Sequence, residues 1–231
     1  MAIQCFDNRT QKVGDDLKEQ IKSGSKIDIA AGLFTIYGYE SLKRELNKIE
    51  HLRFIFTNPA FIENEKKNKQ KKQFKINSNS IKKAIGGSSF EINLINEMKG
   101  KAIAKECRKW IEKKVKFKSN TSNKPIQPHL RLYNEDKNDV YIGIDEFSSV
   151  GFGFEKDNSI FKNIVKTDDF DTTKKFMQNF EEVWQDETIL KDVTNEVASY
   201  ISNLYKENSP EFFYYLTFYN IFDEFLEDIS E

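Results

Sequence analysis

The chain has 231 residues, of which 38% are hydrophobic, and its formal net charge is -1. This length suits one domain with an appendage or two small domains, and the apolar content is enough for a core. No apolar run approaches the ~20 residues that span a bilayer, and the start MAIQCFDNRT lacks the pattern of a signal peptide. We therefore expect a globular, cytoplasmic protein with no membrane association.

The supply of soft metal ligands is small. The chain has two cysteines and two histidines, all far apart in the sequence. Such isolated residues do not form a disulfide framework, a zinc knuckle or a histidine-rich metal site. We expect no metal and no cofactor, with a site made of oxygen ligands left open as an alternative.

The near-zero net charge hides an asymmetry between the two halves. Residues 1–118 contain 26 Lys and Arg against 14 Asp and Glu, whereas residues 119–231 contain 10 against 23, so the halves carry about +12 and -13. A basic first half is compatible with a phosphate-bearing partner such as DNA, and the acidic second half is not a nucleic-acid surface.

The first sixty residues alternate between helix and strand patterns. Apolar residues recur every four positions from Val13 to Ser23, and Gly24 follows as a C-cap glycine would. Lys26–Thr35 is almost continuously apolar or small, which predicts a strand buried on both faces. A helical pattern over Tyr37–Ile49 and a strand over His51–Thr57 follow. This order predicts a parallel strand pair with a helical crossover.

A lysine-rich insertion at about residues 60–80 interrupts this pattern. One interpretation is a loop that follows nucleic-acid phosphates, and the other is an ordinary solvated excursion, which is what charge runs usually are. The candidate nucleic-acid-binding residues in it are Lys66, Lys67, Lys69, Lys71 and Lys72.

The rest of the chain predicts one more long helix, three short strands and then helices alone. The helix covers Phe90–Lys114, and the strands cover Val115–Phe117, His129–Tyr133 and Val140–Ile144. Beyond Asp171 we expect only helices. Two of them have amphipathic faces centred on Phe180 and Val197, and a third, at 209–229, is aromatic on more than one side.

One short motif carries the chemistry. His129, Arg131 and Asp136 have the spacing H-x-R-x4-D, and Gly143 follows. This pattern resembles the H-x-K-x4-D-x6-G-S-x-N signature of the phospholipase D superfamily, whose smaller members include nucleases. The segments CFDNRT, KIDIAAGLFTIYGYESLKREL, AKECRKWIEKKV, GIDEFSSVGFGF and FEEVWQDE look like the phospholipase D-like domain that precedes the motor of some bacterial Swi/Snf-type DNA helicases.

The resemblance implies a metal-independent phosphodiesterase chemistry. In that superfamily one histidine attacks the phosphorus and a second, from another copy of the motif, protonates the leaving oxygen. His51 also lies in a His-Leu-Arg sequence, but no aspartate follows at the right distance, so we take it as a coincidence. An active form would then be a homodimer in which two His129 side chains meet at the twofold axis.

Three departures from the signature weaken the case for catalysis. Arg131 replaces the lysine, and a planar guanidinium differs from an ammonium in how it contacts a phosphate. Ile144 stands in place of the serine and removes a hydroxyl donor. Glu146 stands in place of the asparagine and puts a carboxylate where a phosphate would bind. Each lost donor to developing charge costs a factor of ~10² to 10³ in rate.

A purely structural interpretation of His129 also fits the sequence. In a strand, alternate residues face opposite sides, so Leu130 and Leu132 would fill the core while His129, Arg131 and Tyr133 face the other way.

Together these observations predict an α/β fold with a mixed sheet flanked by helices. The phospholipase D-like domain is expected at residues 1–187 and a helical extension at 188–231. The expected role is that of a catalytically weakened, nuclease-type domain of a DNA helicase or a restriction or defence system, with His129, Arg131, Asp136 and Glu146 as its degenerate site. Such a domain would serve DNA binding or dimerisation, beside a helicase motor fused after it. Two alternatives stay open, an active homodimeric endonuclease and an assembly module with no DNA role.

Overall fold

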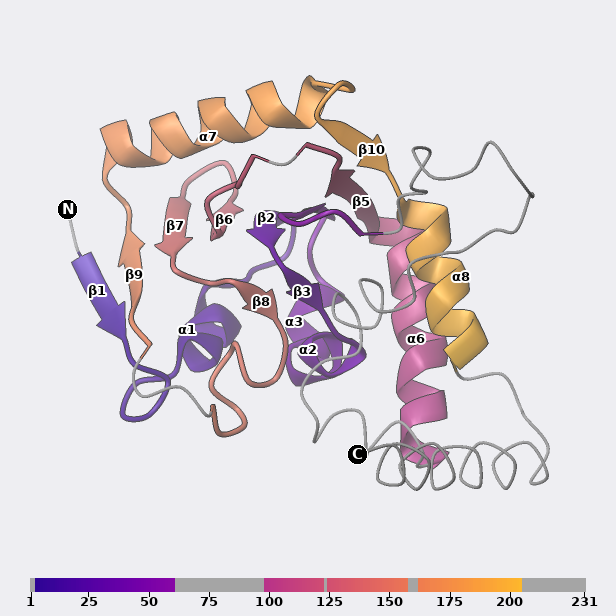
Figure 1. Ribbon diagram of the computed structural model, residues 1–231. Helices are drawn as coiled ribbons and strands as arrows, with labels where there is room; N and C mark the ends of the chain where they lie inside the picture. Colours follow the sequence, from indigo (N-terminus) through magenta and orange to yellow (C-terminus); the bar gives the residue numbers. More distant parts are fainter. Residues whose placement is uncertain (1–2, 61–97, 123, 158–161, 205–231) are drawn as a thin grey trace, which may run out of the picture.

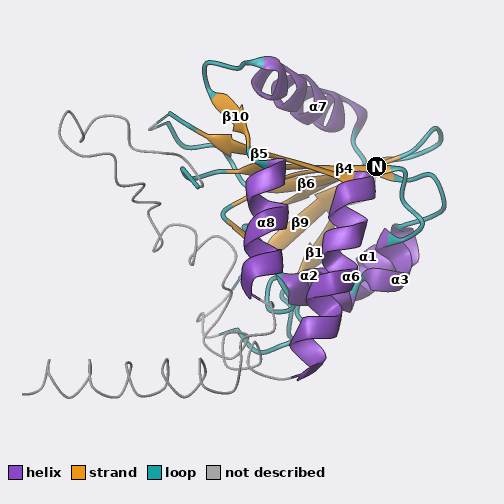
Figure 2. Ribbon diagram, turned by 90° about the vertical axis from the view of Figure 1, so that its right-hand side faces the viewer, coloured by secondary structure: helices purple, strands orange, loops and turns teal. Residues whose placement is uncertain are grey.

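The computed structural model describes residues 3–60, 98–122, 124–157 and 162–204. These residues form an α/β fold built on an eight-stranded mixed sheet with helices on both faces (Figures 1 and 2). The strand order is β1-β9-β7-β6-β2-β4-β5-β10, and a separate two-stranded sheet pairs β3 with β8. The α/β class and the mixed sheet expected from the sequence are confirmed.

The parallel centre of the sheet is formed by three strands. β2 (Lys26–Ala31), β4 (His51–Phe56) and β5 (Val115–Asn120) pair in parallel. Most of their residues are buried, and the apolar side chains on the face toward the main core exclude water. Two short helices, α2 (Ile36–Ser41) and α3 (Lys43–Leu46), cross between β2 and β4, which confirms the predicted crossover.

Antiparallel strands extend both edges of this centre. β6 (His129–Tyr133), β7 (Asn138–Ile142), β9 (Ile164–Thr167) and β1 (Ile3–Phe6) follow on the β2 side. β10 (Leu190–Asp192) closes the β5 side. β1 and β9 were not predicted, since each has only four residues and neither alternates clearly.

The longer helices divide between the two faces of the sheet. α1 (Val13–Gln20), α6 (Met98–Lys114) and α8 (Thr194–Leu204) cover one face together with α2 and α3. α7 (Phe170–Gln185) lies alone across the other face (Figure 2). The Asp169 carboxylate begins α7 because it accepts a hydrogen bond from the Thr172 N–H at 2.9 Å.

The main core lies between the sheet and the five-helix layer. Its centre is a group of aromatic rings in which Phe34 meets Phe54, Phe117 and Phe147 at centroid distances of 5.0–5.7 Å. Close approach also matters there, because a Cβ on Gly38 would lie 2.5 Å from the Phe147 carbonyl oxygen of β8 (Glu146–Phe147). A glycine therefore lets α2 rest against this strand.

Several local predictions need correction. The single helix expected at Tyr37–Ile49 breaks at Leu42, whose φ of -120° and ψ of 16° are not helical. The strand expected at Lys26–Thr35 divides at Gly32 into β2 and β3 (Leu33–Phe34). Gly24 does not cap α1, since the cap is Ile21; its φ of +79° instead serves the turn that leads into β2.

The region beyond Asp171 is not all helix. β10 pairs with β5 there, and the α8 residues Val197 and Ile201 are fully buried in the main core. The amphipathic faces predicted around Phe180 and Val197 are confirmed. The aromatic segment expected to be helical at 209–229 lies outside the described residues, as does the first part of the helix predicted at Phe90–Lys114.

Candidate functional site under helix α7

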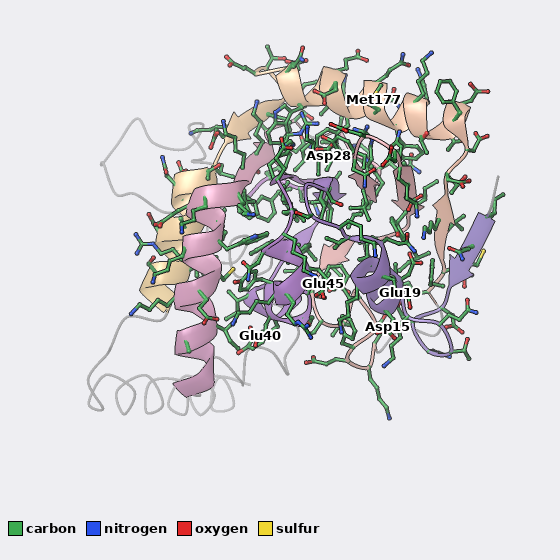
Figure 3. All side chains as sticks on the ribbon, turned by 180° about the vertical axis from the view of Figure 1, so that it is seen from behind. Asp15, Glu19, Asp28, Glu40, Glu45 and Met177 are labelled. Atoms are coloured by element: carbon green, nitrogen blue, oxygen red, sulfur yellow. The ribbon has the colours of Figure 1, made fainter. Side chains whose placement is uncertain are left out.

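Two residues of the predicted motif, His129 and Arg131, lie on the sheet face that α7 covers. Strand register places Asp28 of β2 beside both Arg53 of β4 and Arg131 of β6, and Ala30 beside His129. Alternation then separates the two faces, because the neighbouring leucines Leu130 and Leu132 belong to the main core. Figure 3 shows Asp28 beneath α7, the helix that carries Met177.

Asp28 is the centre of a buried ion network. Its side chain is 0% exposed and accepts from Arg53 Nε at 2.7 Å and Nη2 at 2.9 Å, and from Arg131 Nη1 at 3.1 Å. One carboxylate thus holds two guanidinium groups, one from each neighbouring strand. A buried charge needs such partners, since leaving water without them costs several kcal/mol.

The network also ties α7 to the sheet. Arg53 donates from Nη1 to Glu181 Oε2 at 3.1 Å and from Nη2 to Glu181 Oε1. Burial acts to lower the pKa of Arg53, but the hydrogen bonds that Arg53 donates to Asp28 and Glu181 outweigh it, and the net pKa is raised. The hydrogen bond from Arg53 lowers the pKa of the Glu181 carboxyl. Both groups are therefore charged near neutral pH.

Arg131 is held by two hydrogen bonds and a ring contact. Its Nε donates to Asn138 Oδ1 at 2.8 Å, its Nη1 to Asp28, and its guanidinium carbon lies 3.7 Å from the centre of the Tyr133 ring. The side chain is 6% exposed. Arg131, at the position of the motif lysine, is thus buried and bonded to other residues of the protein.

His129 is sealed between the sheet and α7. The residue is 6% exposed, and its ring centre lies 4.9 Å from that of Phe176 and 6.0 Å from that of Phe180. Nδ1 lies 2.9 Å from the Gln127 carbonyl oxygen, so it carries the proton and donates. Nε2 is then the unprotonated nitrogen, and it is buried with no hydrogen-bond partner in the described structure.

The imidazole of His129 is therefore held in its neutral form. Burial lowers the pKa of its imidazole, and the hydrogen bond to Gln127 opposes this only in part. A nucleophilic histidine needs a free Nε2, which this tautomer provides. However, Nε2 is buried, and two phenylalanine rings of α7 pack against the imidazole.

The two predicted carboxylates lie apart from this cluster. Asp136 is exposed in the turn after β6, at the opposite end of that strand from His129. Glu146 lies on β8, where it accepts from Ser148 Oγ at 2.8 Å and lies 3.5 Å from Lys162 Nζ. Burial raises the pKa of the Glu146 carboxyl. Ile144, at the position of the motif serine, is fully buried in the main core.

The other predicted features remain untested. The five candidate DNA-binding lysines of the insertion lie outside the described residues. Within the part of the chain that the structure describes, no group of three or more His, Cys, Asp or Glu could hold a metal ion. None of the described helices has both the length and the apolar character needed to cross a bilayer.

The sequence did contain a signal for the residues that were missed. Asp28 is a lone acid in the apolar run KIDIAAG, and Arg53 is a lone base in HLRFIF. A charge within a buried strand must find a partner, so the two together predict an ion pair between adjacent strands. Glu181 gave no such signal, because acids are ordinary on the outer part of a helix.

Comparisons with known proteins show partial similarity of fold. No protein-family model matches the chain, and no curated protein matches it. Among solved structures, TrmBL2, an archaeal chromatin protein described as binding DNA in a novel mode, matches with a TM-score of 0.38 and 12% identity over 80% of this chain. The match spans 52% of the TrmBL2 chain, about half its length.

Two further structures match at similar levels. NucT from Helicobacter pylori gives a TM-score of 0.39 and 16% identity, over 78% of this chain and 94% of NucT. The phosphatidylserine synthase of Haemophilus influenzae gives 0.42 and 10%, over 89% of this chain and 44% of the synthase. Both matches have low TM-scores and low sequence identities. They describe the arrangement of the chain and not its activity.

Proposed function

We propose that the chain is a nuclease-type domain of the phospholipase D kind that does not cleave, and that it serves DNA binding or dimerisation in a helicase or a restriction or defence system. The observation that carries the proposal is the state of the motif. His129 is packed under Phe176 and Phe180, and Arg131 is paired with Asp28.

The loss of cleavage follows from how these groups are used. A phosphodiesterase needs a histidine that reaches the phosphorus and cations that contact the phosphate oxygens. Here the cation neutralises a buried carboxylate and the imidazole is covered by apolar rings. His129 and Arg131 are therefore part of the packing between the sheet and α7.

An active homodimeric endonuclease is the second candidate, and one observation favours it. The Nε2 atom of His129 is unprotonated and unpaired, as a nucleophile requires. Two copies would then have to meet at their His129 side chains, and α7 would first have to move off the sheet. That movement breaks the Arg53–Glu181 pair and exposes Phe180 to water.

A cleavage assay with a DNA-binding arm separates the candidates. Supercoiled plasmid is incubated in EDTA with the wild type, His129→Ala and, as a matched control, His51→Ala. We expect no nicking above background from any of them. Nicking by the wild type and His51→Ala that disappears in His129→Ala would establish the endonuclease instead.

The binding arm uses fluorescence anisotropy of a labelled duplex at two salt concentrations, and light scattering gives the oligomeric state. We expect binding that weakens as salt rises, because Lys and Arg replace counterions on the phosphates. A monomer that neither binds nor cleaves DNA would overturn the proposal and leave the assembly module as the remaining function.

A further inference from the structure

A second charged region lies on the opposite face of the sheet from α7. α6 packs beside α2 and α3, and the Trp110 indole N–H donates to the Leu46 carbonyl at 3.1 Å. Between these helices is a groove of about 240 Å³. Its charged residues are four lysines and one glutamate, namely Lys43, Lys109, Lys113, Lys114 and Glu106.

The lysines of this groove differ in their hydrogen-bond and ion-pair partners. Lys114 donates to the Asn47 carbonyl at 2.9 Å and to the Ile49 carbonyl, and Lys43 is paired with Glu106. Lys109 and Lys113 are exposed, and neither has a hydrogen bond or ion pair in the described part of the chain. They are four residues apart, so their backbone positions lie about 6 Å apart along one face of α6.

Two aromatic residues, Tyr39 and Trp110, also line the groove. The Tyr39 and Trp110 rings lie 5.0 Å apart, and both residues are buried to within 4%. Burial raises the pKa of the Tyr39 hydroxyl to about 12, so the hydroxyl keeps its proton near neutral pH. The ammonium groups of Lys109 and Lys113, beside the paired Lys43 and the carbonyl-bound Lys114, form a positive surface that suits an anion with several oxygens.

We propose that this groove, defined by Tyr39, Lys43, Lys109, Lys113 and Lys114, binds phosphate groups of a nucleic-acid backbone. The inference rests on the proposed DNA binding and assigns it to a surface. Within α6 the segment from Lys105 to Lys114 carries five basic and two acidic residues, consistent with the excess of positive charge in the first half of the chain. The groove lies on the sheet face opposite the sealed motif, so binding there needs no movement of α7.

The test compares charge reversals on the two faces of the sheet in the full chain. Lys109→Glu with Lys113→Glu changes the groove, and Lys174→Glu with Lys175→Glu makes the same change of charge on the exposed side of α7. Anisotropy of a labelled duplex is measured from 0.05 to 0.3 M salt, and circular dichroism checks folding. Lys109→Gln with Lys113→Gln provides a milder variant should the reversal unfold the protein.

We expect the groove reversal to weaken binding roughly 10- to 100-fold at 0.1 M salt and to reduce the salt slope by about 1.8, as the loss of two phosphate contacts predicts. The glutamine variant should fall in between, and the α7 reversal should show less than half of the effect. If the wild type binds the duplex and both reversals weaken binding equally, the groove is not the binding site, although the proposed DNA binding still stands. Absence of binding in the wild type would overturn both.

Titration calorimetry with inorganic phosphate and with an acidic peptide identifies the source of the anion. If the duplex binds while inorganic phosphate and the acidic peptide bind weakly or not at all, the groove is a site for the nucleic-acid backbone. Binding of free phosphate or of the peptide more tightly than the duplex would overturn it.

Discussion

The two faces of the central sheet bury different kinds of side chain. The face toward α6 is filled with aromatic and aliphatic side chains, among them Phe34, Phe54 and Phe117. The face toward α7 has only a small apolar cluster around Ala30, Ile55, Phe180 and Leu190, and beside it lies the Asp28 ion network. The same strands carry both, since successive residues point to opposite faces.

This difference shows that the two faces of one sheet depend on different interactions. An apolar core tolerates substitutions that conserve side-chain volume. A buried ion network, in contrast, is strongly destabilised when one of its charged partners is removed. The charges under α7 therefore hold this helix on the sheet, and substitutions of these charged residues should have the largest effects on stability.

The largest effect is expected from removing the shared carboxylate. Asp28→Ala leaves two buried guanidinium groups without their anion, and should lower the free energy of unfolding by about 3–5 kcal/mol. Urea unfolding followed by circular dichroism measures it. Replacing Asp28, Arg53 and Arg131 together by Leu, Met and Met should cost much less than Asp28→Ala alone. A loss below about 1 kcal/mol in Asp28→Ala would show that the network is not buried in solution.

A pH effect should come next, through His129. Because the pKa of its imidazole is lower in the folded state than its ordinary 6.5, the unfolded chain takes up a proton first as pH falls. This contribution to stability is complete above pH 6.5 and is lost as pH falls toward the folded-state pKa, by at most ~1.4 kcal/mol per pH unit.

Urea unfolding at pH 7.5, 6.5 and 5.5 tests this. The difference in stability between the wild type and His129→Gln should shrink as the pH is lowered. The control His51→Gln leaves His129 in place and should follow the wild-type profile. A difference that stays constant across this range would mean that His129 is not buried as a neutral ring.

A smaller effect is expected at the rim of the network. The Glu181 side chain is 38% exposed, so solvent screens its pair with Arg53, and Arg53 keeps Asp28. Glu181→Gln should cost about 1 kcal/mol or less. The exposed Asp136→Ala should stay within about 0.5 kcal/mol of the wild type. Were Asp136→Ala to cost more than Glu181→Gln, the motif aspartate would have a role that its position in the turn does not explain.

The sequence predicted the fold well where burial decided the structure. The strands β2 and β4 are rich in apolar residues, and their predicted parallel pairing was correct. β6 was predicted at its observed bounds from an alternating pattern. β1, β9 and β10 were missed because strands of three or four residues are set by pairing across the sheet rather than by a local pattern.

The candidate site was predicted only in part. That His129 and Arg131 face away from Leu130 and Leu132 follows from alternation along a strand. That α7 covers them could not be foreseen, because the pairing of Arg53 with both Asp28 and Glu181 joins residues up to 128 positions apart. A motif gives spacing along one strand, whereas the chemistry of the site depends on what packs over it.

The central claim, that His129 is sealed beneath α7, is tested most directly by chemical modification. Diethyl pyrocarbonate acylates accessible imidazoles, and mass spectrometry follows both histidines of the same molecule. We predict rapid modification of His51, whose side chain is 36% exposed, and protection of His129 until urea unfolds the protein. Modification of His129 in the native protein as fast as that of His51 would contradict the account.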